Sequence, residues 1–243
     1  MSKVYVVGMG PGAYEQMTIK AARVLEDCDV IVGYTVYVEL LKEHFPEKEY
    51  LTTPMKQEIK RCEMAFEEAE KGKLVAMVCS GDAGIYGMAG LIYEVGERYP
   101  QVEIEVVPGV TAAMGGGAVL GAPLGHDLAI ISLSDLLTPW EKIEQRVLKA
   151  SEADLVICLY NPSSKKRADY LRKACELMLN FKSEETVCGV VKNIARAGEE
   201  MTIYTLGELK DVAVDMFSTV FIGNSQTKVL RGKMITPRGY RHE

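Results

Sequence analysis

The residues best suited to holding a ligand lie in one short stretch, Ser80 to Gly87, which reads Ser-Gly-Asp-Ala-Gly-Ile-Tyr-Gly. It directly follows Leu74–Cys79, an apolar run that predicts a buried strand. Glycines let the backbone turn sharply and let a flat ligand lie against bare peptide groups. Ligands of open α/β sheets bind beyond the carboxyl ends of strands, where Asp82 falls. An ordinary glycine-rich turn with a solvated Asp82 explains this local sequence about equally well.

Similar turns follow three other predicted strands and begin at Gly8, Pro108 and Tyr160. Turns gathered at the carboxyl ends of strands form a cleft lined mainly by backbone, which suits a nucleoside-like ligand. The turn at Gly8 also matches the G-x-G-x-x-G/A fingerprint formally, so a nicotinamide oxidoreductase is an alternative. Pro11 disfavours immediate entry into a helix, and no acidic residue follows the next predicted strand, Val30–Val32, to bind a ribose. Both features count against that alternative.

The sequence lacks the motifs on which several classes of enzyme depend. It contains no G-x-x-x-x-G-K-[ST] phosphate loop and no G-x-S-x-G nucleophile elbow. Its three histidines lack ligand spacing and its six cysteines include no C-x-x-C pair, so we expect reduced thiols and no metal site. The formal net charge of −6 argues against a nucleic-acid surface spread over the protein. Because no charged leader and apolar stretch precede the first strand, we expect no secretory signal, and the expected reduced thiols indicate a cytoplasmic protein.

The hydrophobic pattern predicts two α/β domains, 1–120 and 121–243. In the first, apolar strands alternate with helices, which predicts a parallel sheet. In the second, strands expected at 186–191, 201–205 and 219–222 are joined by short loops, so the later ones are expected to be antiparallel neighbours in a mixed sheet. The uncharged segment 106–125 contains two prolines and six glycines. We therefore expect it to form a strand, a turn and a buried helix, and not a membrane span.

Local signals predict helix starts and buried faces within these domains. Thr18 and Thr138 are expected to be N-caps, because each precedes a helical pattern. Residues 56–71 are expected to form an amphipathic helix with Ile59 among its apolar positions. Three adjacent glycines, 115–117, would each cost a helix about 1 kcal/mol relative to alanine, so a neighbouring backbone or a ligand is expected to pack closely there.

Three motifs, at their separations in this chain, resemble those of a known family. They are Gly8-Met9-Gly10-Pro11-Gly12, the 80–87 stretch, and Val107-Pro108-Gly109-Val110-Thr111-Ala112. Together they resemble the N-terminal motifs of the S-adenosylmethionine-dependent tetrapyrrole (corrin/porphyrin) methylases, and the resemblance spans nearly the whole chain. Residues 125–140, 159–164 and 236–240 resemble the precorrin-3B C17-methyltransferase branch of cobalamin biosynthesis.

The resemblance implies the tetrapyrrole methylase fold: two α/β domains, with an N-terminal parallel sheet, a C-terminal mixed sheet and the active-site cleft between them. It also implies a homodimer, with S-adenosylmethionine as the cofactor. Ala83 stands where the family often has proline, a change that leaves the turn feasible. The motif match implies the following cofactor-binding residues: Pro11, Gly81, Asp82, Ala83, Ile85, Tyr86, Thr111, Ala112, Tyr160 and Asn161.

The implied substrate is a tetrapyrrole, precorrin-3B or cobalt-precorrin-3. An acidic protein would repel such a polycarboxylate macrocycle unless cations were gathered locally. Cations gather at 165–167 and near the C-terminus, and a solvated basic face is the alternative explanation for both clusters. The substrate-binding candidates are Gly10, Ser132, Ser134, Lys165 and Arg167.

Methyl transfer from a sulfonium to carbon depends mainly on holding the two groups in line at near-attack distance. In the C17 branch methylation is coupled to ring contraction, which requires proton transfers. His126 and Asp135 are the catalytic candidates, with a structural role in a loop at least as plausible for His126. We therefore expect C17 methylation with ring contraction, on either a metal-free or a cobalt-containing substrate. The alternatives are methylation of another ring position or another acceptor, such as a modified protein side chain, and a nucleotide-binding sensor without catalysis.

Overall fold

The computed structural model describes residues 2–164 and 167–240 and divides into two compact units, Met1–Ala112 and Ala113–Glu243. The division falls before the predicted boundary at 120/121. The difference is due to helix α5 (Ala112–Leu120), whose residues pack within the second unit. A Cβ atom at Gly116 would lie only 2.9 Å from the ring of Phe221, and Leu120 lies against Gly189 in the same way.

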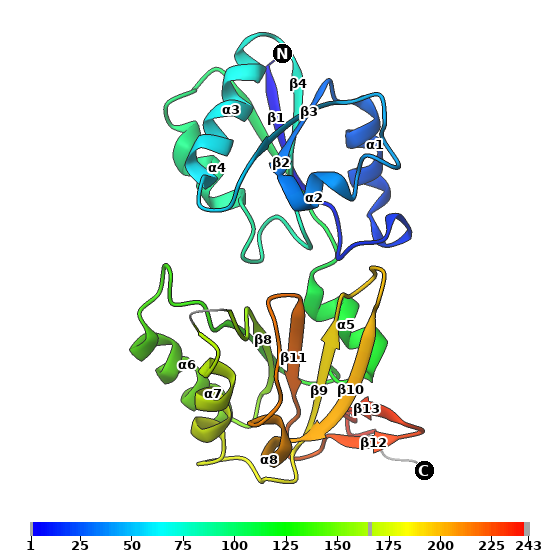
Figure 1. Ribbon diagram of the computed structural model, residues 1–243, viewed down its shortest axis with the longest axis vertical. Coiled ribbons are helices and arrows are strands. Elements are labelled where there is room, and N and C mark those ends of the chain that lie inside the picture. The colour runs from blue at the N-terminus through cyan, green and yellow to red at the C-terminus, as the bar shows by residue number, and fades with distance from the viewer. Residues whose placement is uncertain (1, 165–166, 241–243) are drawn as a thin grey trace. The chain divides into compact units, whose positions relative to one another are not determined.

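The first unit contains a five-stranded sheet of order β3-β2-β4-β1-β5, in which every pair is parallel (Figure 1). The predicted parallel sheet is confirmed. The central strand β4 is buried along all but its first residue, which explains its uninterrupted apolar sequence. The sequence pattern does not predict β3, because this edge strand reads Glu-Tyr-Leu-Thr-Thr and is only partly buried. The strands are β1 (Lys3–Gly8), β2 (Val30–Tyr34), β3 (Glu49–Thr53), β4 (Leu74–Cys79) and β5 (Glu103–Val107).

Helices cover both faces of this sheet, because alternate residues of a strand point to opposite faces. Val75 and Met77 of β4 belong to the apolar core that includes α3 and α4. Ala76 and Val78 belong to the core on the other face, which includes α1 and α2. Thr18 is the N-cap of α1, as predicted, and its Oγ1 accepts a hydrogen bond from the Ala21 amide at 3.1 Å. The helices are η1 (Tyr14–Gln16), α1 (Ile19–Asp27), α2 (Thr35–Glu39), α3 (Glu58–Glu70) and α4 (Ala89–Gly96).

The second unit contains a mixed sheet of order β10-β9-β11-β8-β7. Strands β7 and β8 are parallel, while β11 is antiparallel to both β8 and β9, and β10 is antiparallel to β9. The predicted mixed sheet with antiparallel later strands is confirmed. The strands are β7 (Leu128–Ser132), β8 (Val156–Tyr160), β9 (Val187–Lys192), β10 (Glu200–Thr205) and β11 (Ser218–Ile222).

Helices pack on both faces of the mixed sheet as well. Val220 and Ile222 of β11 share an apolar core with α6 (Trp140–Glu152), α7 (Tyr170–Met178) and α8 (Leu206–Leu209). Phe221, which points the other way, lies against α5 at Gly116. The glycines of α5 therefore make room for side chains, of Phe221 and Ile194 at Gly116 and of Leu124 at Gly117, and not for the neighbouring backbone or ligand expected from the sequence.

A small third sheet joins the start of the second unit to its C-terminal segment. Its order is β12-β13-β6, from the hairpin β12 (Lys228–Leu230) and β13 (Lys233–Ile235) and the short strand β6 (Gly121–Ala122). The segment 106–125 thus forms parts of β5, α5 and β6, as a strand, a helix and a short strand. Within the described residues, every helix is too short or too polar to cross a membrane.

Two local predictions are wrong. The N-cap of α6 is Pro139, with no side-chain cap, so Thr138 lies one residue outside the expected position. Ile59 is 57% exposed, whereas Arg61 on the same helix is only 4% exposed. Cys62, Phe66 and Ala69 lie on the buried face of α3, as expected from the sequence, but this face includes Arg61 in place of Ile59.

Candidate functional site

The first two predicted turns lie side by side beyond the carboxyl ends of β1 and β4. The Gly10 amide donates to the Gly81 carbonyl at 3.1 Å, and the Gly81 amide donates back to the Gly10 carbonyl at 2.8 Å. Gly10 and Gly81 have φ angles of +77° and +71°, a left-handed conformation that glycine adopts without steric cost. The glycines of both motifs are thus needed to form this backbone bridge.

The third turn, which follows β5, packs into the same place. A Cβ atom at Gly109 would lie 2.2 Å from the Gly81 carbonyl oxygen and 2.5 Å from that of Gly8, so no side chain can be accommodated there. The hydroxyl of Thr18 donates to the Pro108 carbonyl at 3.2 Å, which ties the start of α1 to this turn. The structure therefore brings the three sequence motifs of the first unit together through their backbones.

Asp82 holds these turns in place with its carboxylate. Oδ1 accepts hydrogen bonds from the amides of Gly84 at 2.8 Å and Ile85 at 3.1 Å. Oδ2 accepts from the Gly109 amide at 2.9 Å, which links the second motif to the third. Hydrogen bonds to an ionised acceptor are stronger than neutral ones. Asp82 is thus a brace between turns, and the alternative of a merely solvated aspartate is wrong.

The predicted cofactor-binding residues of the first unit differ in exposure. Tyr86 is 57% exposed and has a φ of +54°, which is unusual for a residue other than glycine, and Ile85 is 39% exposed. Asp82 and Ala112 are half-buried. Tyr86 and Ile85 are thus the most exposed of these predicted residues, while the buried ones shape the backbone beneath them. The buried residues are Pro11, Gly81, Ala83 and Thr111, and the substrate-binding candidate Gly10 is buried as well.

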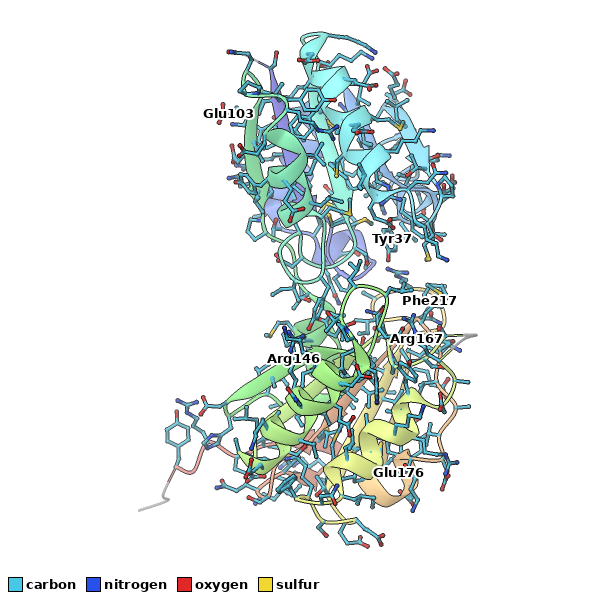
Figure 2. The ribbon with its side chains drawn as sticks, turned by 90° about the vertical axis from the view of Figure 1, so that its left-hand side faces the viewer. Tyr37, Glu103, Arg146, Arg167, Glu176 and Phe217 are labelled. Carbon is cyan, nitrogen blue, oxygen red and sulfur yellow. The ribbon has the colours of Figure 1, made fainter. Side chains whose placement is uncertain are left out.

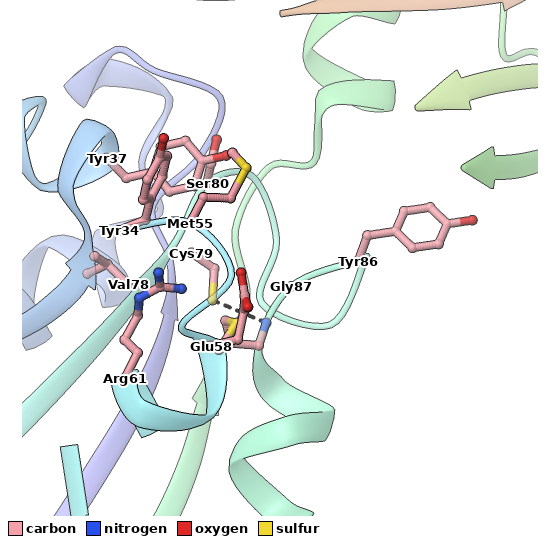
Figure 3. Close-up of a pocket in the computed structure, with 11 residues that line it drawn as sticks. Tyr34, Tyr37, Met55, Glu58, Arg61, Val78, Cys79, Ser80, Tyr86 and Gly87 are labelled. Carbon is pink, nitrogen blue, oxygen red and sulfur yellow. Dashed lines mark hydrogen bonds between the residues drawn. The ribbon is translucent and has the colours of Figure 1, made fainter. Parts of the chain in front are cut away.

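A pocket of about 220 Å³ lies beside the 80–87 turn (Figure 3). Its lining includes Tyr34, Tyr37 and Arg61, none of which the sequence reasoning selected. The sequence signal that could have identified Arg61 is its position on the apolar face of an amphipathic helix. Cys79 also lines the pocket, but burial raises the pKa of its thiol to about 11, so this group is neutral at physiological pH and a poor nucleophile.

In the second unit, polar turns follow β7, β8 and β9, three strands that run in the same direction. The Tyr160 hydroxyl accepts a hydrogen bond from the Ala113 amide at 2.7 Å, so it caps the start of α5. The Asn161 side-chain amide donates to Ser132 Oγ at 3.0 Å, and this oxygen also accepts from the Ser134 amide at 3.2 Å. The sequence-predicted residues after β7 and β8 thus form one connected group.

Arg167 and Asp135 extend this group. Arg167 Nη1 donates to Ser134 Oγ at 2.7 Å and to Asp135 Oδ1 at 3.1 Å. The Tyr170 hydroxyl donates to Asp135 Oδ2 at 2.7 Å. Figure 2 shows Arg167 at the same end of the second unit as Phe217, which precedes β11, and away from Glu176 on α7.

These contacts change the chemistry available to Asp135. The Tyr170 hydroxyl, followed by the Arg167 guanidinium, lowers the pKa of the Asp135 carboxyl below its usual range. The carboxylate is therefore ionised at neutral pH and is a weak base. Its geometry fits the positioning of Arg167 better than proton transfer.

The structure does not bring together all the predicted residues of the second unit. His126 is half-buried and precedes β7, whereas Ser132 ends that strand, so His126 and Asp135 lie at opposite ends of β7. Lys165 and Lys166 lie outside the described residues, as does Arg241 of the C-terminal cluster. Within the described part of the chain, no three His, Cys, Asp or Glu side chains are grouped so as to hold a metal ion.

The architecture is that of an α/β protein in which three glycine-containing turns meet through their backbones. The family model of the Tetrapyrrole (Corrin/Porphyrin) Methylases matches residues 3–210. The chain therefore belongs to this family and is a methyltransferase, which confirms the family predicted from the motifs.

Individual relatives resemble the chain over nearly its whole length. A Salmonella typhimurium protein named "Probable cobalt-factor III C(17)-methyltransferase" is 48% identical over 236 residues, 97% of this chain and 98% of the relative. A Sinorhizobium protein named "Precorrin-3B C(17)-methyltransferase" is 36% identical over 246 residues, 98% of this chain and 96% of the relative. The crystal structure of the methyltransferase CobJ superposes with a TM-score of 0.90 at 30% identity, covering 98% of this chain and all of CobJ.

Proposed function

We propose that this protein transfers a methyl group from S-adenosylmethionine to C17 of a precorrin-3-type tetrapyrrole and takes part in the accompanying ring contraction. The observation that carries the proposal is the joining of the three family motifs by the Gly10–Gly81 bridge and the Asp82 carboxylate. The names of the relatives, at 36–48% identity, support the same activity.

The residues of the turn cluster fit an adenosyl cofactor. A Cβ atom at Gly109 or Gly87 would collide with backbone carbonyls of the neighbouring residues, so these glycines let the turns pack closely and present peptide groups beside Tyr86 and Ile85. S-adenosylmethionine would supply the electrophilic methyl group. The chain's own contribution would be to bind and orient the two reactants, which is the largest part of catalysis for a transfer of this kind.

Specific residues can be assigned within this mechanism. The motif residues of the first unit would hold the cofactor, with Tyr86 and Ile85 as its accessible side chains. For Tyr160 and Asn161 the proposal of cofactor binding rests on the motif match alone. Arg167, positioned by Asp135, would hold a carboxylate of the macrocycle. The low pKa of Asp135 argues against it as the proton donor in ring contraction.

The higher identity to the cobalt-factor III enzyme makes the cobalt-containing macrocycle the first substrate to test. Incubation with methyl-labelled S-adenosylmethionine and cobalt-factor III should give a singly labelled, ring-contracted product. Metal-free precorrin-3B serves as the second arm. If NMR maps the label to another carbon, the enzyme methylates a different position of the ring. The absence of label in both macrocycles would refute the proposal.

The family resemblance also supports a homodimer. All six cysteines are free and buried, which agrees with a reducing compartment such as the cytoplasm. Light scattering coupled to size exclusion should give twice the mass of the chain, 26.8 kDa.

A further inference from the structure

Arg61 is a buried cation in the first unit. Its side chain rises from α3 toward the end of β3, where Nε donates to Thr53 Oγ1 at 3.0 Å. Nη2 donates to the carbonyls of Thr53 at 3.4 Å and Pro54 at 3.1 Å. Arg61 is 4% exposed, and its guanidinium lies 5.8 Å from the centre of the Tyr34 ring. All of these partners are uncharged.

The remaining nitrogen of Arg61 has no partner in the described part of the chain. Neither a hydrogen bond to Nη1 nor an ion pair with a carboxylate is found there. The one fully buried and unpaired side-chain polar atom among the described residues is Gln16 Oε1, so Nη1 must be open to solvent. Arg61 is also a lining residue of the pocket, so the pocket is the space through which an anion would approach Nη1.

The pocket has the size and walls of a site for a small anionic group. Its volume of about 220 Å³ is below the range of roughly 300–1,000 Å³ that holds whole drug-sized ligands. Tyr34 and Tyr37 form one wall, with ring centres 5.2 Å apart in an edge-to-face arrangement. Ser80, the first residue of the 80–87 turn, also lines the pocket (Figure 3). A carboxylate arm fits this space, whereas a whole tetrapyrrole does not.

Among the described residues that line the pocket, Glu58 is the one carboxylate, and its negative charge opposes that of an incoming anion. Its Oε1 accepts a hydrogen bond from the Lys56 amide at 3.0 Å, so the group is held by its own loop and makes no ion pair with Arg61. Buried charges are normally paired, because removing an ion from water is costly. An incoming carboxylate would supply the missing counter-ion by accepting a hydrogen bond from Nη1, since Nε and Nη2 are already engaged with Thr53 and Pro54.

We propose that this pocket binds one carboxylate side arm of the tetrapyrrole, with Arg61 Nη1 as its counter-ion, and thereby sets the orientation of the ring beside the 80–87 turn. The inference rests on the proposed function for the identity of the macrocycle. The pocket could also bind the carboxylate of the cofactor's methionine moiety, so the experiment measures the binding of the macrocycle and the binding of the cofactor separately.

The experiment compares two dissociation constants. Cobalt-factor III is titrated by absorbance into protein holding S-adenosylhomocysteine, and S-adenosylhomocysteine alone is titrated by calorimetry. Arg61→Gln should weaken macrocycle binding by about tenfold to a hundredfold, the usual loss for a hydrogen-bonded charge, and leave cofactor affinity within about twofold. Arg61→Lys, which keeps the charge but loses the planar fork, should show a smaller loss.

Two further variants test the charge balance. Glu58→Gln removes the repelling carboxylate and should tighten macrocycle binding by about twofold to fivefold, the size of a single exposed charge interaction. Arg98→Gln is the matched control, because Arg98 is exposed, pairs with Glu63 and lies outside the pocket. It should leave both constants within about twofold.

Each contrary result overturns the proposal in a recognisable way. Weakened cofactor binding with unchanged macrocycle binding would assign the pocket to the cofactor. Unchanged constants in folded Arg61→Gln would leave Arg61 a purely structural residue. If Arg61→Gln fails to fold, unchanged or weaker macrocycle binding by Glu58→Gln refutes the carboxylate subsite. In all these cases the wild-type protein still methylates the macrocycle, whereas failure of the proposed function would remove that activity.

Discussion

The two units place polar turns at the carboxyl ends of parallel strands, but they build these turns from different materials. In the first unit, peptide groups of three glycine-containing turns contact one another directly, and Asp82 is the side chain that ties them together. In the second unit, the contacts are made by side chains, chiefly Arg167, Asp135 and Tyr170. The first arrangement is a rigid set of close backbone contacts, and the second is a network of charged and polar side chains.

This difference predicts how each region tolerates change. A site made of close backbone contacts should fail when any atom is added, whatever its polarity, because the interior cannot expand cheaply. A network of partly exposed charges should tolerate substitution in its overall fold but respond to pH and salt. The following variants test these expectations.

Gly109→Ala should have the largest effect. The new methyl group would meet the carbonyl oxygens of Gly81 and Gly8 at 2.2 and 2.5 Å, so the turns must separate. We expect the free energy of unfolding to fall by about 1–3 kcal/mol, the usual cost of overpacking, and cofactor binding to be lost. Urea unfolding and calorimetry with S-adenosylhomocysteine measure the two effects.

Gly90→Ala is the matched control for this change. Gly90 lies in α4, and a Cβ atom there would meet nothing within 4 Å. Replacing glycine by alanine inside a helix should stabilise the protein by about 0.5–1 kcal/mol and leave the cofactor affinity unchanged. Normal cofactor affinity in folded Gly109→Ala would mean that the three glycine-containing turns of the first unit do not form the cofactor site.

Asp82→Asn should have the next largest effect. An amide keeps one acceptor oxygen and replaces the other with a donor, so it can no longer satisfy the amides of both Gly84 and Gly109. We expect a stability loss of about 1–3 kcal/mol and a tenfold to hundredfold weaker affinity for S-adenosylhomocysteine. Asp211→Asn, at a surface aspartate paired with Arg172, is the control and should change neither quantity measurably. Equal affinities for the two variants would contradict the bracing role.

Much of the first unit could be predicted because its signals are local. The apolar run of β4 and the glycines of the three motifs each follow from a short piece of sequence, and the structure brings the motifs together. Thr18 could be identified as an N-cap for the same reason. In contrast, β3 is polar, and its pairing with β2 across the edge of the sheet leaves no periodic pattern in the sequence.

The remaining site residues depend on contacts between distant segments. Arg61 occupies the apolar face of α3 because three acceptors of the segment 53–54 receive its hydrogen bonds, a pairing that helical periodicity cannot indicate. Asp135 looked like an acid or base in sequence because Arg167 and Tyr170, its partners, lie more than thirty positions away. Tyr160 likewise caps α5 through a partner, Ala113, 47 positions earlier. Long-range hydrogen bonds decide these roles.

Asp135→Asn should have the smallest effect, and one that depends on pH. Because the pKa of Asp135 is lowered in the folded protein, its ionised form stabilises the fold above the unfolded value of about 3.9. This stabilisation is lost as pH falls through the lowered folded pKa. The melting temperature of wild type should therefore exceed that of Asp135→Asn by a small, constant amount between about pH 6 and 8, and the difference should shrink below about pH 4.

Tyr170→Phe sharpens the test, because Tyr170 is the main cause of the lowered pKa. Without its hydroxyl, the pKa of Asp135, followed by NMR of the side-chain carboxyl, should move up toward its usual value. Both variants should bind S-adenosylhomocysteine as wild type does, since the cofactor motifs of the first unit are untouched. A normal or raised pKa of Asp135 in the wild-type protein would contradict the proposed network of charged side chains in the second unit. Asp135 would then again be a candidate for proton transfer.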